Sequence, residues 1–238
     1  REAAALLENE LGEPRRALAS LRRAVEIDPR DPASFDELER LAEVASDYSV
    51  LAGLAEAVMV SGLVEGTDKR DLAERGARWY RDHLRDAAGE EACLRAVLSV
   101  DSSDIETHSR VLELVRARGD SAALMQQLSA MADVTHDTQA RHTYLHEAGA
   151  LALAAGVRDL AIRSYEGVLE VKADDTAALA ALADLRHATG NHAEVVHLLS
   201  RWLSHEADAQ TRLALRYRIA EAQHASLGDV EQAIQTYQ

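Results

Sequence analysis

Two histidines have a spacing that could bind a metal ion. His142 and His146 are four residues apart in a segment expected to be helical, and Glu147 follows directly. Side chains four residues apart lie on one helix face, so both imidazoles could coordinate a divalent cation such as zinc. Two ligands do not complete a site, and the sequence fixes no third ligand nearby. We therefore predict no metal here and interpret both histidines as solvent-facing or interhelical polar residues.

A second set of histidines and a glycine-containing segment are weaker candidates for a metal site and a phosphate-binding site. His187, His192 and His197 are five residues apart, which rotates successive side chains by about 140° on a straight helix. The segment 62–69 contains the glycines and the lysine of a phosphate-binding loop, but the lysine does not follow the second glycine directly and no strand precedes it. We interpret this segment as a connection between helices and predict no cofactor.

Nucleophilic catalysis has no sequence basis. The chain lacks Gly-x-Ser-x-Gly and His-Glu-x-x-His motifs, so we expect a protein that is not an enzyme. Cys93 is the only cysteine, which excludes a disulfide within the chain, and we expect it to pack in the interior. Four large aromatics could anchor a partner, but we expect them to fill seams between packed helices: Trp79, Tyr80, Trp202 and Tyr217.

Helices are the elements that must position these residues. Ala and Leu dominate a hydrophobic share of 47% while aromatics contribute 4%, which is typical of close helix packing. The net charge of −15 disfavours nucleic acid and anionic lipid as partners. The longest nearly uncharged run, residues 51–64, contains Glu56 and is too short to span a membrane, so we expect it in a core.

The compartment and the ends of the chain are less determined. A single cysteine leaves the redox compartment open, and we expect a soluble, cytoplasmic protein. Lys occurs only at 69 and 172 among 26 basic residues, a bias found in GC-rich bacterial genomes. Both ends fall within expected helices, so we expect a longer array, and a fragment of it that associates end to end.

Helix boundaries follow from Gly, Pro, Asp and Asn, which recur about every 15 to 20 residues. They predict fourteen helices and no strand: 2–11, 14–27, 31–45, 47–61, 68–85, 89–100, 104–118, 120–134, 137–155, 157–171, 175–189, 191–205, 208–226 and 229 onward. Side-chain caps are expected at their starts: Asp31, Ser46 with Asp47, Asp104, Asp120, Asp137, Asp175, Asn191, Asp208 and Asp229.

The helices repeat as a double hairpin. Gly156, Ala161, Ile162 and Tyr165 recur as Gly228, Ala233, Ile234 and Tyr237 at a shift of 72 residues, and Gly12, Ala17, Leu18 and Leu21 precede them by 144. Arg70, Arg141 and Arg212 recur at a spacing of 71. Periodicity of this kind indicates stacked supersecondary units, here four helices each.

The pattern resembles the tetratricopeptide repeat. Gly12, Ala17, Leu21, Ala24 and the Asp28-Pro29 turn carry the resemblance in the first hairpin, and the glycine, alanine and tyrosine of the repeated segments carry it later. Glu90 and Val195 depart from the pattern, because each stands where the second-helix Ala is expected. Proline follows no hairpin except the first, and the even-numbered hairpins are degenerate.

The resemblance implies an all-α, right-handed α-solenoid of about seven antiparallel helical hairpins with a concave groove. We expect one array over 1–238 with approximate units 1–31, 32–66, 67–103, 104–136, 137–174, 175–207 and 208–238. Groove residues in this family lie on the first helix of each hairpin. Here they would include Asp36, Arg40, Glu43, Ser109, Glu113, Arg116, Ala180, Asp184 and His187.

The groove implies a scaffold that binds a peptide or helix of another protein. A clamp for a terminal carboxylate built from Lys and Asn is not expected, because both residue types are scarce here: Lys69, Lys172, Asn9 and Asn191. An alternative is the sensing or substrate-recruiting region of a larger enzyme or regulator.

Overall fold

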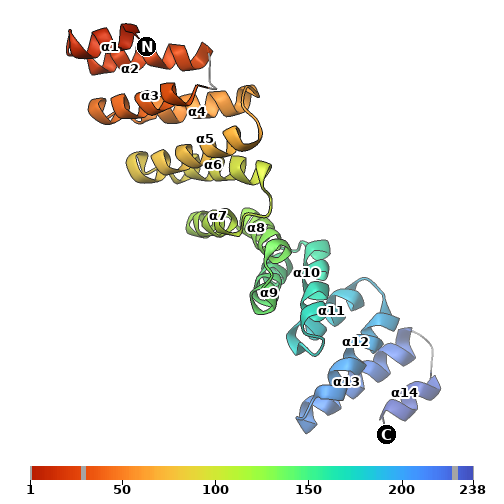
Figure 1. Ribbon diagram of the computed structural model, residues 1–238. Coiled ribbons are helices and arrows are strands. Elements are labelled where there is room, and N and C mark those ends of the chain that lie inside the picture. The colour runs from red at the N-terminus through yellow and green to blue at the C-terminus, as the bar shows by residue number, and fades with distance from the viewer. Residues whose placement is uncertain (1, 28–30, 227–229, 238) are drawn as a thin grey trace. The chain divides into compact units, whose positions relative to one another are not determined.

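The computed structural model describes residues 2–27, 31–226 and 230–237, and every regular element in these ranges is helical. Figure 1 shows them in order. The first seven are α1 (Glu2–Asn9), α2 (Pro14–Ile27), α3 (Pro32–Ala45), α4 (Ser49–Ser61), α5 (Gly66–Trp79), α6 (Ala87–Val100) and α7 (Ile105–Arg118). The others are α8 (Ser121–Val134), α9 (Thr138–Ala154), α10 (Arg158–Val171), α11 (Thr176–Ala188), α12 (His192–His205), α13 (Ala209–Glu221) and α14 (Val230–Tyr237).

Within each unit, most helices that are neighbours in the chain pack against one another, most extensively α9 with α10, α5 with α6, α8 with α9 and α11 with α12. Short turns between packed helices make them antiparallel, so the fold is the all-α solenoid of helical hairpins that the sequence predicts (Figure 1). The right-handed superhelix stays a prediction. No helix in the described ranges is long and apolar enough to cross a membrane.

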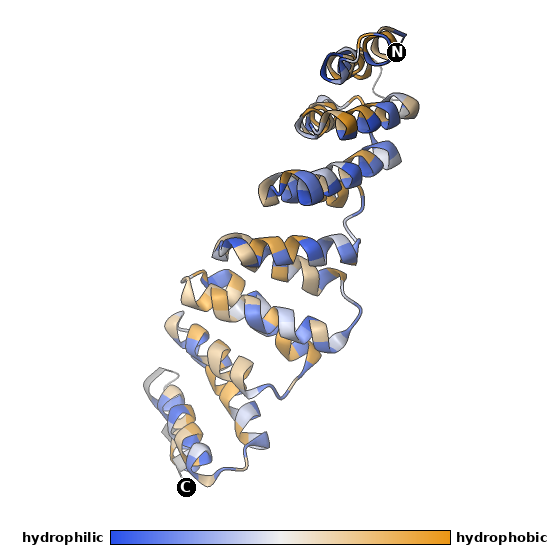
Figure 2. Cartoon of the chain, turned by 90° about the vertical axis from the view of Figure 1, so that its left-hand side faces the viewer, coloured by the Kyte–Doolittle hydropathy of each residue, from blue (hydrophilic) through white to orange (hydrophobic). Residues whose placement is uncertain are grey.

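The chain divides into two compact units, residues 1–114 and 115–238, and the boundary falls within α7. The core of the first unit contains Leu21, Leu38, Leu51 and Trp79. The core of the second contains Tyr165, Leu179, Leu182 and Leu199. Within individual helices, hydrophobic and hydrophilic residues alternate around the ribbon (Figure 2), as expected where one face packs and the other meets solvent. The single array of seven units stays a prediction.

The apolar run 51–64 packs as the sequence predicts. Leu51, Leu54, Val58 and Val64 are buried, and only the outward side of this run, including Val60, is exposed. Helix α4 therefore contributes to the core of the first unit rather than presenting an apolar surface of its own.

Most predicted caps are confirmed. Asp120 and Asp137 each accept hydrogen bonds from the amides two and three residues ahead. Asp175, Asn191 and Asp208 each accept one from the amide three residues ahead. A further cap is present at Asp104, which accepts from the Thr107 amide at 3.0 Å. These bonds satisfy amides that the first helical turn leaves unpaired, which is why the helices begin where they do.

Two predicted caps are wrong. Asp31 precedes α3 but its side chain accepts from the Ser34 hydroxyl at 2.5 Å rather than from an amide. Ser46 ends α3 in the left-handed conformation, at φ 52°, and Asp47 accepts from the Ser49 hydroxyl, so Tyr48 occupies the position before α4. The expected features at Asp28, Pro29, Gly228 and Asp229 lie outside the described residues.

Other boundaries moved by a few residues. The connection expected over 62–67 is shorter, because α5 begins at Gly66, whose φ of 56° suits glycine. Asp86 caps α6 by accepting from the amides of Ala88 and Gly89, so this helix begins before residue 89. Helices α5 and α13 continue as π-helical turns, η1 (Tyr80–Leu84) and η2 (Ala222–Ser226), where we predicted regular helix.

Two glycines allow helices to approach aromatic rings closely. A Cβ placed on Gly89 in α6 would lie 2.3 Å from the ring of Tyr80. A Cβ on Gly149 in α9 would lie 3.1 Å from the ring of Tyr165 in α10. Tyr165 and Ala161 are buried, so the segment from Gly156 to Tyr165 specifies packing between helices, as the repeat pattern predicts.

Candidate functional site

The odd-numbered helices form a common layer in each unit, because long side chains join each of them to the next. We call the exposed side of these helices the odd-helix face. All nine predicted groove residues lie on odd-numbered helices: Asp36, Arg40, Glu43, Ser109, Glu113, Arg116, Ala180, Asp184 and His187.

In the first unit, arginines link α1, α3 and α5. Arg40 of α3 donates to Glu8 of α1 at 2.5 and 2.8 Å and also pairs with Glu37. Arg75 of α5 reaches back to α3, where it pairs with Asp36 at 3.1 Å and with Glu39 at 2.6 Å. Two predicted groove residues, Asp36 and Arg40, therefore hold neighbouring helices together.

Glu39 is the centre of a polar network that the sequence did not reveal. It accepts from the indole nitrogen of Trp79 at 2.8 Å as well as from Arg75. The Arg75 guanidinium lies 5.6 Å from the Trp79 ring centre and 5.9 Å from that of Phe35, within cation–π range. Burial opposes ionisation of Glu39, but the bonds from Trp79 and Arg75 outweigh it, so its pKa lies below the usual value.

In the second unit, the same kind of link joins odd-numbered helices. Arg116 of α7 donates to Glu147 of α9. Arg218 of α13 donates to Asp184 of α11 at 2.5 Å. The predicted groove residues Arg116 and Asp184 thus have partners on the next odd-numbered helix.

The remaining predicted groove residues differ in their surroundings. Glu113 pairs with Arg110 of the same helix at 2.8 Å, and the Ser109 hydroxyl donates to the Ile105 carbonyl. Glu43 is exposed, Ala180 is half-buried, and His187 is exposed with its ring edge-on to that of His192 at 5.2 Å.

Arg110 also explains a departure from the repeat pattern. Glu90 of α6, where an Ala is expected, is 3% exposed and accepts two bonds from the Arg110 guanidinium, at 2.7 and 3.0 Å. The hydrogen bonds that Arg110 donates to Glu90 and Glu113 raise its pKa. A buried carboxylate is tolerated because this two-pronged pair satisfies both of its oxygens.

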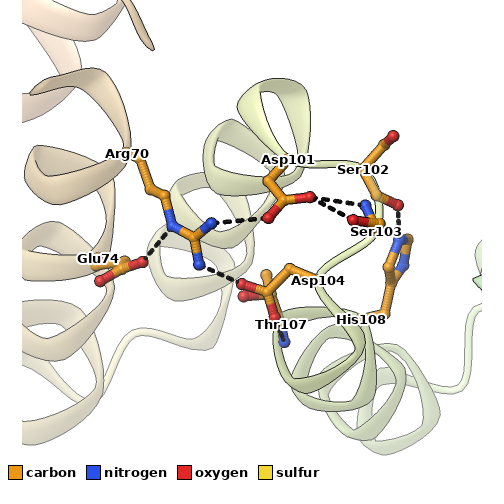
Figure 3. Close-up of polar contacts among 8 residues, drawn as sticks. All are labelled: Arg70, Glu74, Asp101, Ser102, Ser103, Asp104, Thr107 and His108. Atoms are coloured by element: carbon orange, nitrogen blue, oxygen red, sulfur yellow. Dashed lines mark hydrogen bonds and ion pairs between the residues drawn. The ribbon is translucent and has the colours of Figure 1, made fainter. Parts of the chain in front are cut away.

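Arg70 fixes the turn between α6 and α7 (Figure 3). Its guanidinium extends from α5 and pairs with Glu74, Asp101 and Asp104 at 2.7 to 2.8 Å. The hydrogen bonds that Arg70 donates to Glu74 and then to Asp101 raise its pKa. Since Asp104 also caps α7, one arginine ties the start of one hairpin to the start of the next.

The other copies of this arginine act on similar turns with different partners. Arg141 lies 3.7 Å from Glu170 at the end of α10, while its neighbour His142 contacts Asp175, the cap of α11, at 3.0 Å. Arg212 donates to the carbonyls of Leu203 and Glu206 in the turn before α13. The recurring arginine therefore stabilises the junctions between hairpins, which accounts for its spacing.

His142 and His146 both contact side chains of other helices or turns. His142 bonds Asp175, and the ring of His146 is edge-on to Tyr165 at 5.8 Å. Both histidines line a hollow of about 460 Å³ with Glu147 and Lys172. In the described part of the chain, no three His, Cys, Asp or Glu side chains gather as metal ligands would. The interpretation of His142 as an interhelical polar residue is confirmed.

The other chemical candidates have structural roles. Lys69 of the glycine-containing segment donates to the Ser99 hydroxyl at 3.1 Å. Cys93 is fully buried against Gly76, and burial followed by the nearby Glu56 carboxylate raises the pKa of its thiol to about 12. Trp79 and Tyr80 fill seams as predicted, and Trp202 is half-buried. The prediction is wrong for Tyr217, which is 55% exposed.

Comparison with known proteins gives similarity to helical repeat structures. No family model and no curated protein matches the chain. A solved structure of a MamA protein is 14% identical, with a TM-score of 0.41 over 71% of this chain and 87% of that one. A tetratricopeptide repeat protein from Parabacteroides merdae ATCC 43184 is 14% identical, with a TM-score of 0.35 over 99% of this chain and 88% of that one.

The tetratricopeptide repeat domain of P58(IPK) is 13% identical, with a TM-score of 0.33 over 99% of this chain and 80% of that one. Two of these three proteins are thus described by the repeat that the sequence resembles. Because the TM-scores lie below 0.5, the likenesses transfer no residue, partner or activity to this chain.

Proposed function

We propose that this chain is a protein–protein interaction scaffold, not an enzyme, and that its odd-helix face binds a peptide or helix of a partner protein. The observation that carries the proposal is the set of ion pairs between successive odd-numbered helices, such as Arg40 with Glu8 and Arg218 with Asp184. They hold the face in one arrangement before a partner arrives. A pre-organised surface loses less conformational entropy on binding than a mobile one.

The composition of the face supports a polar, adaptable interface. Fixed charges of both signs lie along it, and exposed residues such as Glu43 and His187 lie between them. Complementary charge on a partner would set its register and orientation, because electrostatic matching contributes specificity more than affinity. Small residues such as Ala180 would let the partner's backbone come close to the helices of this face.

The test selects peptides on the chain from a displayed library and compares their binding to matched variants. Ser109→Arg and His187→Arg place a large charged side chain on the odd-helix face, in α7 and α11. Ser200→Arg and His197→Arg make the same changes at exposed positions of α12, an even-numbered helix. We expect the first pair to reduce peptide affinity and the second pair to leave it unchanged. Equal losses from both pairs would contradict the proposal.

A further inference from the structure

A hollow of about 430 Å³ in the first unit is lined by four arginines. Arg70 and Arg78 come from α5, Arg81 from η1 and Arg110 from α7. We call this feature the arginine hollow. Its lining also includes three carboxylates, and further carboxylates pair with Arg70, Arg81 and Arg110, in a chain whose overall net charge is −15. It belongs to the odd-helix face, because most of its lining comes from α5 and α7.

Two of these arginines have side chains fixed by ion pairs, and they form walls of the hollow. Arg70 is held by Glu74, Asp101 and Asp104, as Figure 3 shows. Arg110 is held by Glu90 and Glu113. Their charges are matched within the protein, so their contribution is to fix the shape of the hollow.

The other two arginines are left with unmatched bonding capacity. Arg78 is exposed and makes no hydrogen bond or ion pair in the described residues, although its charge influences Glu39. The Arg81 side chain bonds only Asp82, the next residue, at 3.0 and 3.4 Å, and it is 44% exposed. Asp82 and Glu90 favour the charge on Arg81, but the Arg110 guanidinium is near enough to oppose it.

Arg78, near the end of α5, and Arg81, in the π-helical turn η1, both line the hollow. A carboxylate between two guanidiniums can accept paired N–H bonds from each, the strongest type of hydrogen bond available to these groups. Ala77 and Leu94 add apolar surface to the same hollow. This surface suits the methylene groups of a glutamate side chain.

We propose that the arginine hollow binds glutamate side chains of an acidic segment in the partner protein, with Arg78 and Arg81 as the recognising groups. The inference rests on the proposed function and specifies the chemistry of the partner. A long polyanion such as nucleic acid is disfavoured, because the chain's overall negative charge repels it beyond the hollow. A short segment meets mainly the local field, since charges more than about 8 Å away are screened at physiological salt.

The test uses blocked hexaglutamate and hexaglutamine peptides, labelled and followed by fluorescence anisotropy. We expect saturable binding of hexaglutamate that weakens as salt rises, and no binding of hexaglutamine. The double variant R78Q/R81Q should weaken hexaglutamate binding about tenfold or more, the effect of losing charge-assisted bonds. Neither arginine contributes to the core, and unchanged circular dichroism will show that the variant folds.

Arg95→Gln is the matched control. Arg95 lies on α6 of the same unit and does not line the hollow, and within the part of the chain that the structure describes its side chain pairs only with Glu91, one turn away. The substitution removes one positive charge, as each of the single variants R78Q and R81Q does, so comparison with those single variants is matched in charge. Arg95→Gln should leave hexaglutamate binding within about twofold of wild type. Equal losses from Arg95→Gln and R78Q/R81Q would mean that general charge, not the hollow, attracts the peptide, and would overturn the inference.

Absence of hexaglutamate binding would also overturn the inference, as would a preference for a phosphoserine peptide that hexaglutamate cannot displace. The proposed function has a separate outcome. Library peptides that bind wild type and R78Q/R81Q alike, but lose affinity with Ser109→Arg or His187→Arg, would retain the scaffold and reject the arginine hollow as its glutamate site.

Discussion

Replacing Gly89 by alanine should destabilise the first unit by adding a single methyl group. The new Cβ would lie 2.3 Å from the Cδ1 and Cε1 atoms of Tyr80, closer than any ordinary contact. Tyr80 cannot easily move, because it is 9% exposed and its hydroxyl donates to Glu56 at 2.6 Å. Overpacking of this kind costs about 1–3 kcal/mol, while alanine in a helix gains about 0.5–1 kcal/mol over glycine. We expect a net loss of about 1–2 kcal/mol.

Gly53→Ala is the control in the same unit. Gly53 is exposed on α4. Apart from its chain neighbours and its own helix backbone, no atom of the described residues lies within 4 Å of the position that an alanine methyl group would take, so alanine there should stabilise by about 0.5–1 kcal/mol. Urea unfolding followed by tryptophan fluorescence measures both changes. In a Trp202→Phe background, Trp79 is the sole tryptophan and reports on the first unit alone.

The two substitutions should therefore shift the urea midpoint in opposite directions. If Gly89→Ala stabilises as much as Gly53→Ala, the close approach of α6 to Tyr80 does not exist in solution. The helix pair would then need a wider crossing, and the explanation given for Gly89 would be refuted.

Two further predictions concern ionised groups. Arg110→Met leaves the 3%-exposed Glu90 without its partner and should cost about 3–5 kcal/mol, while the double change E90M/R110M should recover most of that loss in the same urea assay. An equal loss in both would show that the pair contributes packing rather than charge. Burial opposes ionisation of Asp175, but bonds from the Ala178 amide and then His142 outweigh it and lower its pKa from 3.8. The ionised Asp175 carboxylate thus stabilises the folded protein fully above pH 3.8, and this stabilisation is lost as pH falls through the lower pKa of the folded state. In Asp175→Asn, the free energy of unfolding should therefore fall less steeply with decreasing pH than in wild type. An unchanged dependence of the unfolding free energy on acid pH would contradict this.

Helix boundaries could be predicted from the sequence because local bonds set them. Asp120 and Asp137 cap helices through amides two or three residues away, and Gly156 turns the chain at φ 74° within the same few residues. The failures at Asp31 and Ser46 have the same local origin. The Ser34 hydroxyl donates to the Asp31 carboxylate in place of a backbone amide. Ser46 adopts the left-handed conformation that is more common for glycine.

The bonds across the odd-helix face could not be predicted, because their partners are far apart in the chain. Arg75 meets Glu39 across 36 positions and Arg218 meets Asp184 across 34, which is about one hairpin. The repeat period indicates that such helices are neighbours, but long side chains can reach several carboxylates. Only the packed structure selects one. The nine predicted groove residues could thus be placed on helices from the sequence, but their pairings could not.

Departures from the repeat are where this chain acquires individual properties. Where residues agree between copies, as at Ala17, Ala161 and Ala233, they are buried where helices pack, which any array of this fold requires. Glu90 breaks the pattern, and its pairing with Arg110 compensates for the break. That pairing also holds Arg110 as one wall of the arginine hollow, which Arg81 lines as well. Glu90 therefore weakens the repeat pattern in the sequence and also shapes the surface that we propose recognises a partner. The residues that decide partner specificity should be sought at positions where the copies of the repeat differ.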